Sequence, residues 1–362
     1  MNTSQRVRRA GLATLAALVI GGSGVAIGAA AADSSASGTL TAATATATPG
    51  PATATAPSPD SYASVVRQVL PSVVLIRTEN GLGSGVVLDT KGNIVTNAHV
   101  AGDATTFQVQ VAGDTAPRSA KLVGTYPPDD LAVIRADDPS GLQPAKFGDS
   151  GKVQAGDVVL AIGNPLGLSG SVTQGIISAT DRAVTEPATD GSPAATLPGA
   201  IQTSAPINPG NSGGALVSTS GQVVGIPTLA AGSPQGGGQA QGIGFAIPSN
   251  LARDIATQII DTGHVTNSHR AAIGAEVATV LGPDGTAGGV GVVAVTSGGG
   301  AERAGLRAGD VITAVGGAQT TDTTALSQAL AAAKPGDTVT VAISRDGQDR
   351  SVQVTLGELP GS

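Results

Sequence analysis

The chain has 362 residues, no cysteine, a formal net charge of −7 and only 1% aromatic residues. This length suggests two or three domains, whose cores must be built from small and β-branched side chains, and that composition favours strands over large helices. The negative charge and the lack of a basic patch argue against nucleic acid as a partner, and the lack of cysteine excludes disulfides, thiol catalysis and zinc sites ligated by cysteine.

Residues 1–32 have the pattern of a targeting segment. Arg6, Arg8 and Arg9 precede an uncharged run that ends in four alanines before Asp33. A basic region, an apolar region and small residues in this order are typical of a cleaved signal peptide. The uncharged run also reaches the roughly 20 residues that a membrane-spanning helix needs, so a membrane anchor stays open as the alternative. Both interpretations predict an exported protein.

Residues 33–60 consist of Ala, Thr, Pro, Ser and Gly with almost no large apolar side chain. Such a segment cannot bury enough surface to offset its ordering entropy, so we predict a disordered linker. Ser61 has the residue type of a helix N-cap, and a short helix is predicted from there to Leu70, ended by Pro71.

Short strand patterns separated by Gly, Asp and Pro follow in two sets. The first set comprises residues 73–76, 85–88, 94–96, 107–111 and 131–134. The second set comprises residues 158–162, 172–179, 200–203, 222–226 and 243–247, before a helix pattern at 248–259. Short strands without long helices between them are typical of a barrel or a sandwich. Gly81–Gly85 is glycine-rich like a phosphate-binding loop, but a strand follows it instead of a helix.

Three polar residues lie where these patterns would place a catalytic site. His99 follows a β-branched run, Asp130 opens a strand, and Ser212 is surrounded by glycines. A serine hydroxyl needs a base to take its proton, and the base needs an orienting acid. The chain order His, Asp, Ser is that of the chymotrypsin barrels and differs from the orders in subtilisin and the α/β-hydrolases. The first two residues fall in the first set of strands and the serine in the second.

The segments around these residues resemble the three signatures of the HtrA/Deg family of trypsin-like serine proteases. The matching segments are Thr96–Val100 (TNAHV), Asp130–Val133 (DLAV) and Asn208–Gly214 (NPGNSGG). The resemblance implies a mainly β protein, with a two-barrel chymotrypsin-like protease domain followed by a small α+β PDZ domain. The implied boundaries are 61–262 for the protease domain, 263–269 for a linker and 270–358 for the PDZ domain.

The resemblance also implies a role for each residue. Ser212 is expected to be the nucleophile, His99 the general base and Asp130 the acid that holds the histidine tautomer. Asp129 is the rival acid, and the Asp-Leu-Ala-Val pattern of the family selects its neighbour. The N–H groups of Gly210 and Ser212 are the expected oxyanion donors. No metal and no cofactor are expected.

The primary pocket is predicted from the same resemblance. Ile207 corresponds to the apolar residue that shapes this pocket in the family, and Thr228–Ala230 would form the opposite wall. A pocket without a buried acid favours small aliphatic side chains at the cleaved position. Ser204, Pro206 and Pro227 depart from the family pattern around this pocket.

Regulation is expected to depend on loop ordering. Asp181 and Arg182 resemble the start of the sensor loop of the family, which would continue as a segment rich in Pro, Gly and Ala to about Gly199. Arg182 would then help to order the oxyanion loop; the alternative is a solvated arginine. Asn211 stands where digestive relatives carry the aspartate that pairs with a new N-terminus, so activation by propeptide cleavage is not expected.

The C-terminal segment is predicted to bind peptides. Ile273, Gly274 and Ala275 stand where PDZ domains have the loop that binds a C-terminal carboxylate, while the peptide adds a strand to the sheet edge. Further expected elements are strands at 289–295, 339–343 and 351–355, a helix through 326–330 and a turn at 346–347. A packing domain without ligand is the alternative.

Two functions stay open at this point. The first is a serine endopeptidase of the cell envelope, membrane-anchored or secreted, that hydrolyses misfolded or signalling proteins under PDZ control. The second is a protease-like peptide-binding module or chaperone that acts mainly through its PDZ domain. The expected partners are unfolded or extended polypeptides and C-terminal peptides, and the family resemblance suggests a homo-trimer.

Overall fold

The computed structural model describes residues 59–79, 81–164, 170–186, 195–208, 210–232, 239–282 and 285–360. The predicted targeting segment and almost all of the predicted linker lie outside these ranges. Within them, no helix has both the length and the apolar character that crossing a membrane requires.

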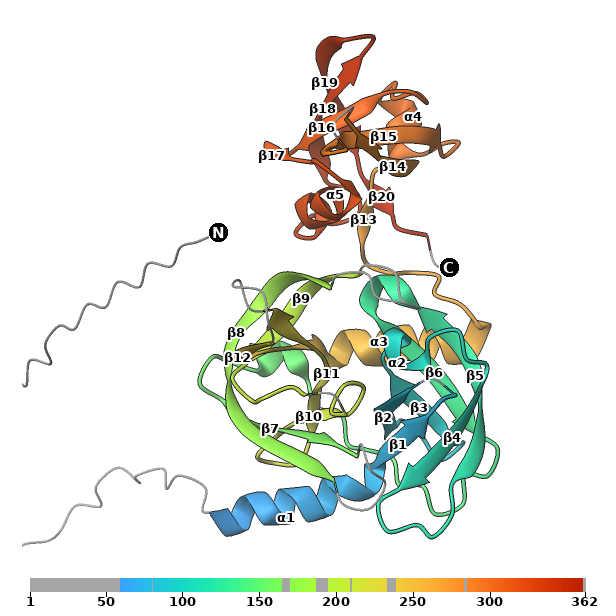
Figure 1. Ribbon diagram of the computed structural model, residues 1–362, viewed down its shortest axis with the longest axis vertical. Helices are drawn as coiled ribbons and strands as arrows, with labels where there is room; N and C mark the ends of the chain where they lie inside the picture. Colours follow the sequence, from blue (N-terminus) through green and yellow to red (C-terminus); the bar gives the residue numbers. More distant parts are fainter. Residues whose placement is uncertain are drawn as a thin grey trace, which may run out of the picture. The chain divides into compact units, whose positions relative to one another are not determined.

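Six strands of the N-terminal part close into a first barrel (Figure 1). They are β1 (Val73–Arg77), β2 (Leu82–Val87), β3 (Asn93–Thr96), β4 (Thr106–Val111), β5 (Arg118–Tyr126) and β6 (Leu131–Ala136), in the order β1-β2-β3-β6-β5-β4. Ile94 pairs with Ile134 across β3 and β6, and both side chains are fully buried. All strands except β5 were predicted from the sequence.

A second barrel follows in the chain. Its strands are β7 (Val158–Gly163), β8 (Ser171–Glu186), β9 (Ala195–Thr203), β10 (Ala215–Ser218), β11 (Val223–Gly232) and β12 (Gln239–Pro248), in the order β10-β11-β12-β9-β8-β7. One hydrophobic core joins both barrels, because Val86 and Val133 of the first pack in the same cluster as Leu160 and Ile226 of the second. The two barrels therefore share part of their hydrophobic core.

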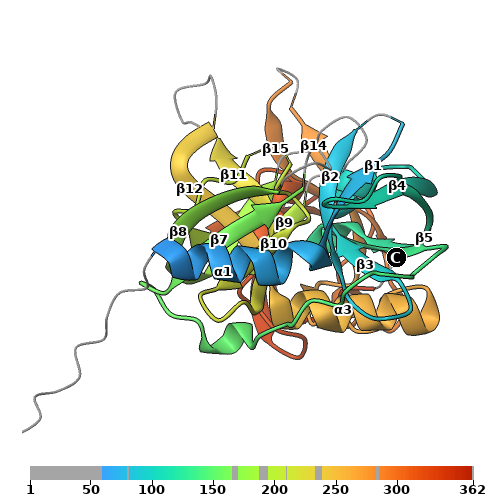
Figure 2. The same ribbon diagram turned by 90° about the horizontal axis from the view of Figure 1, so that it is seen from below.

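The helices of this region frame the two barrels (Figure 2). They are α1 (Pro59–Val69), α2 (Ala98–Ala101) and α3 (Ser249–Thr262), with 3-10 turns at Leu70–Ser72, Pro127–Asp129 and Ser150–Lys152. The buried residues Ile255 and Ile259 of α3 belong to the shared core, so this helix ties the barrels together. The predicted N-cap at Ser61 is wrong, because α1 already begins at Pro59; proline suits the first turn, where its missing N–H would have no helical partner.

The C-terminal domain is a small α+β unit. Its elements are β13 (Ala271–Ala272), β14 (Ala275–Leu281), β15 (Ala287–Val295), α4 (Gly300–Arg303), β16 (Val311–Val315), β17 (Ala318–Gln319), α5 (Thr323–Leu330), β18 (Thr338–Arg345), β19 (Gln348–Thr355) and β20 (Gly357–Glu358). The main sheet has the order β14-β15-β16-β18-β19, β17 pairs with β16, and β13 pairs with β20. Asp322 caps α5 by accepting a hydrogen bond from the N–H of Ala325. The predicted fold class, mainly β with two barrels followed by a small α+β domain, is confirmed.

Candidate active site

His99 and Asp130 face each other across the top of the first barrel. His99 lies in α2, directly after β3, and Asp130 connects the turn Pro127–Asp129 to β6. Nδ1 of His99 is 2.9 Å from Oδ2 and 3.0 Å from Oδ1 of Asp130, and the main-chain N–H of His99 donates to Oδ1 at 2.9 Å. A carboxylate that accepts from Nδ1 favours the tautomer in which Nε2 carries no proton and can act as a base.

The backbone of Asp130 explains how its carboxylate reaches the histidine. Asp130 has φ 51°, in the left-handed region that aspartate tolerates better than most residues. Its carbonyl oxygen accepts hydrogen bonds from the N–H of Ala98 and from Nδ2 of Asn97, both at 3.1 Å. These contacts hold the segment that carries His99 directly against the turn that carries the acid.

The rival acid Asp129 is directed elsewhere. Its side chain is fully buried and pairs with Nη1 of Arg270 at 3.1 Å, and the same nitrogen donates to the carbonyl of Pro128 at 2.5 Å. Burial raises the pKa of Asp129 to about 6, which the nearby Arg270 guanidinium only partly offsets. The geometry therefore favours Asp130 as the partner of the histidine.

Thr228, in β11, joins the two barrels at this point. Its hydroxyl donates to Oδ2 of Asp130 at 2.5 Å, and its carbonyl oxygen accepts a hydrogen bond from Oγ of Ser212 at 3.1 Å. A hydrogen-bonded chain thus runs from His99 through Asp130 and Thr228 to Ser212. Sequence reasoning placed Thr228 only in a pocket wall, because nothing local indicates a partner 98 residues earlier in the chain.

The glycines after Ser212 are required by close packing. Gly213 has φ 76°, and a Cβ atom there would lie 2.2 Å from the carbonyl oxygen of Ser84 in β2. A Cβ atom on Gly214 would lie 2.3 Å from the carbonyl oxygen of Ile162 in β7. Ser212 is therefore held in a loop whose glycine backbone contacts both barrels directly.

The loop around Ser212 also presents two main-chain donors. Within the described part of the chain, the N–H groups of Gly210 and Ser212 donate no hydrogen bond, whereas the N–H of Asn211 between them donates to the carbonyl of Asn208 at 3.1 Å. The buried Asn211 side chain accepts from the N–H of Asn208 at 3.2 Å and donates to the carbonyl of Pro206 at 3.1 Å. The asparagine thus shapes the loop by neutral hydrogen bonds.

The residues predicted for the primary pocket and the sensor loop are Ile207 and Arg182. Ile207 is 4% exposed and belongs to the core of the second barrel, where Gly244 leaves room for it. The described residues of the predicted sensor loop lie in two paired strands, because β8 continues to Glu186 and β9 already begins at Ala195. Arg182 is exposed in this hairpin opposite Ala200, and among the described residues its side chain has no ion pair or hydrogen bond.

A cavity of about 500 Å³ opens beside His99. It is lined by three residues after β1, by residues of α2 and the turn that follows it, and by the first residue of β4: Thr78, Glu79, Gly81, His99, Val100, Ala101, Gly102, Asp103, Ala104, Thr105 and Thr106. These lining residues belong to the first-barrel part of the chain, and most of them have polar or small side chains.

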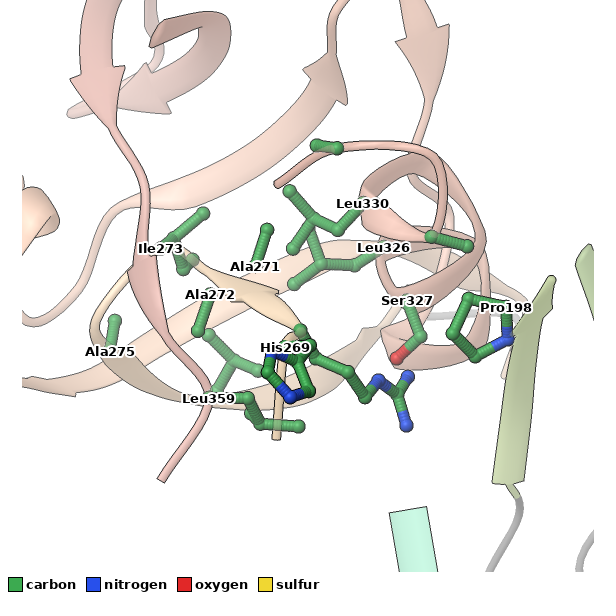
Figure 3. Close-up of a pocket in the computed structure, with 14 residues that line it drawn as sticks. Pro198, His269, Ala271, Ala272, Ile273, Ala275, Leu326, Ser327, Leu330 and Leu359 are labelled. Carbon is green, nitrogen blue, oxygen red and sulfur yellow. The ribbon is translucent and has the colours of Figure 1, made fainter. Parts of the chain in front are cut away.

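A second cavity, of about 170 Å³, lies between β14 and α5 of the C-terminal domain (Figure 3). Ile273 and Ala275 line one side, while Leu326 and Leu330 point into it from the helix. Gly274 has φ 77°, which gives the chain a tight bend before β14. Two of the three residues predicted for the carboxylate loop therefore line an apolar groove beside a strand edge.

Family models match most of the described chain. A trypsin-like peptidase domain matches residues 83–226, which contain His99, Asp130 and Ser212, and a PDZ domain matches residues 265–356. Serine protease PepD of Mycobacterium tuberculosis is 39% identical over 320 residues, which are 82% of this chain and 66% of that protein. The periplasmic pH-dependent serine endoprotease DegQ of Escherichia coli K12 is 35% identical over 330 residues, 82% of this chain and 70% of that protein.

Solved structures give the same result. The HtrA-type protease AlgW with a decapeptide has a TM-score of 0.53 and 33% identity, covering 83% of this chain and 99% of that one. The serine endoprotease from Yersinia pestis has a TM-score of 0.54 and 37% identity, covering 84% of this chain and 100% of that one. The chain spans 56 to 70% of the length of the curated relatives PepD, DegQ and the E. coli periplasmic endoprotease DegP.

Proposed function

The chain belongs to the HtrA family of trypsin-like serine proteases with a PDZ domain, and we propose that it is an endopeptidase that cleaves unfolded or extended polypeptides with Ser212. The observation that carries this proposal is the hydrogen-bonded chain from the His99 ring through Asp130 and Thr228 to the Ser212 hydroxyl. The pair of His99 and Asp130 supplies a base and an orienting acid, and the Ser212 hydroxyl, which donates to the Thr228 carbonyl, supplies the nucleophile once it gives its proton to His99.

The proposed reaction follows from these positions. The Ser212 oxygen attacks the carbonyl carbon of the scissile bond while His99 Nε2 takes the hydroxyl proton, a transfer that contributes about 10²–10⁴-fold. Asp130 stabilises the imidazolium that forms. The oxyanion accepts from the N–H groups of Gly210 and Ser212, and the leaving amine takes the proton from the imidazolium. Water then hydrolyses the acyl-enzyme with His99 again as the base.

The groove of the PDZ domain is the proposed regulatory site. We infer that a C-terminal peptide adds a strand beside β14, with its carboxylate at the loop Ile273, Gly274 and Ala275 and its apolar side chain against Leu326 and Leu330. The similarity to AlgW, which was solved with a decapeptide and with a tripeptide, supports a peptide-binding role. Control of proteolysis by such peptides is part of the proposal.

An extracytoplasmic location is also proposed. The relatives DegQ and DegP are periplasmic proteases, and the N-terminal sequence has the pattern of an export signal. Cleavage of this signal, retention as an anchor and assembly into trimers are finer proposals that the same relationship suggests.

The second candidate, a peptide-binding module or chaperone, rests on the apolar groove alone. Labelled casein, an unfolded substrate, separates the two candidates. Ser212→Ala should lower the cleavage rate by about 10³-fold or more, because the hydroxyl is the nucleophile. Ser220→Ala, an exposed serine in the turn after β10, is the matched control and should cleave like the wild type. Undiminished cleavage by Ser212→Ala would show that the assigned site is wrong, whereas a wild type that binds casein without cleaving it would leave only the second candidate.

A further inference from the structure

Ser84, in the glycine-rich strand β2, is a fully buried polar residue of the first barrel. Its hydroxyl donates to the carbonyl oxygen of Gly210 at 2.5 Å, which lies 126 residues later in the chain. The same oxygen accepts a hydrogen bond from the N–H of Asn164, at the end of β7, at 2.8 Å. The side chain therefore connects β2 to two segments of the second barrel.

The backbone of Ser84 contacts the same loop. Its N–H donates to the carbonyl oxygen of Ser212 at 3.0 Å. Its own carbonyl oxygen accepts from Oγ1 of Thr96 at 2.7 Å, which holds β2 against β3. Ser84 thus binds the carbonyl groups of both residues whose N–H groups are the proposed oxyanion donors.

Because each peptide unit is planar, the two held carbonyl groups also limit the directions of the neighbouring N–H groups. The carbonyl of Gly210 and the N–H of Asn211 share one plane, and the carbonyl of Ser212 and the N–H of Gly213 share another. The N–H of Ser212 lies in the single peptide unit between these two planes, and the N–H of Gly210 lies in the unit just before them. Fixing both planes therefore restricts the direction in which each donor can point.

The opposite side of the loop lies close against the backbone of β7. A Cβ atom on Gly163 would lie 2.5 Å from the carbonyl oxygen of Gly210 and 2.6 Å from the Cα of Asn211. The loop is therefore packed between β2 and the end of β7. The hydroxyl of Ser84 has a single proton, so turning the Gly210 carbonyl away would leave a buried donor without an acceptor, which is costly.

We propose that Ser84 is a positioning residue that orients the oxyanion donors by holding the carbonyl groups of Gly210 and Ser212. This inference deepens the proposed function and rests on it. Ser84 does not touch the substrate, so its loss should act on the transition state, in which the oxyanion forms, and hardly on substrate binding.

The test is Ser84→Ala in the full chain, with Ser249→Ala as the matched control. Ser249, the first residue of α3, is also fully buried, and its hydroxyl donates to the carbonyl of Gly148 at 2.9 Å. Direct loss of one oxyanion donor costs about 10²–10³-fold in kcat, so loss of its positioning should cost about 10–10²-fold. The KM of Ser84→Ala should stay within about threefold of the wild-type value. Ser249→Ala should keep kcat within about threefold of the wild type, even if it lowers Tm by as much as Ser84→Ala does.

A peptide boronic acid provides the second measurement, because its tetrahedral adduct places an oxygen at the oxyanion position. Its affinity should fall by the same factor as kcat in Ser84→Ala, and Ser84→Cys, which keeps a weak donor, should give an intermediate value. A kcat and boronate affinity of Ser84→Ala equal to those of Ser249→Ala would overturn the inference. If Ser84→Ala does not fold, Ser84→Cys with wild-type kcat and affinity would overturn it in the same way. Failure of the proposed function is distinct, because Ser212→Ala would then keep its activity.

Discussion

Replacing Thr228 with valine removes one hydrogen bond from the candidate site and little else. Valine keeps the β-branched shape that suits β11. The main-chain carbonyl of this residue, which accepts from Ser212, stays in place. The lost bond is the one from the threonine hydroxyl to Oδ2 of Asp130, 2.5 Å long and buried.

The size of the effect can be worked from this one contact. A hydrogen bond to a charged group contributes about 1.5–3 kcal/mol, and about 1.4 kcal/mol corresponds to a factor of ten in rate. We therefore expect Thr228→Val to lower kcat/KM by about 10- to 150-fold. The loss should fall mainly on kcat, because Asp130 orients the base and stabilises the imidazolium during the reaction.

Steady-state kinetics with a fluorogenic peptide measure this effect. Thr228→Ser should recover most of the lost activity, because it restores the hydroxyl. Thr320→Val is the control, since Thr320 is a buried threonine of the C-terminal domain that donates to the carbonyl of Ile312 at 3.3 Å. A Thr228→Val enzyme whose kcat/KM stays within twofold of the wild type would refute the role given to this hydrogen bond.

Three further predictions concern other parts of the molecule. Because burial raises the pKa of Asp129 from 3.8 to about 6, the folded chain keeps this proton where the unfolded chain has lost it. The free energy of unfolding of the wild type should therefore fall relative to Asp129→Asn by roughly 3 kcal/mol between pH 4 and pH 7 in urea titrations; a constant difference contradicts this. Gly213→Ala should abolish casein cleavage. Gly242→Ala should keep it, because Gly242 has a similar φ of 74° but open space where the added Cβ would lie. Equal activities of the two variants would show that the close approach of Gly213 to Ser84 is unimportant. Leu330→Asp should weaken binding of a peptide with a free C-terminal carboxylate at least about tenfold in fluorescence polarisation, because a charge enters an apolar groove. Gln328→Asp, outside the groove, should not weaken it. Unchanged binding by Leu330→Asp would exclude the groove as the peptide site.

The candidate catalytic residues were accessible from the sequence because each has a local signature. His99 and Asp130 stand at strand ends with distinctive neighbours, and Ser212 stands in a run of glycines that a tight loop requires. The turn at Asp346 and Gly347 was predicted for the same kind of reason, since both residues adopt positive φ values, 54° and 75°. Patterns of this kind depend on a few adjacent residues.

Some elements lacked such a signature. Strand β5 has no regular alternation of buried and exposed residues, and its pairing with β6 shifts register between Leu122 and Gly124. Strand β10 has only four residues, Ala215–Ser218, directly after the glycines of the loop. The segment that follows Arg182 was predicted as a loop from the family resemblance, yet Thr185 of β8 and Thr196 of β9 pair at 3.2 Å.

The residue types of the candidate site, their order along the chain and the expected division into two barrels and a smaller C-terminal domain could be read from the printed residues. The folded chain was needed to show which side chains hold the site together. Thr228 reaches the carboxylate of Asp130, and Ser84 reaches the loop of Ser212, across separations of 98 and 126 residues. Hydrogen bonds of this kind depend on where the two barrels meet in space. A buried hydroxyl is shielded from solvent, so it needs a hydrogen-bond partner within the protein.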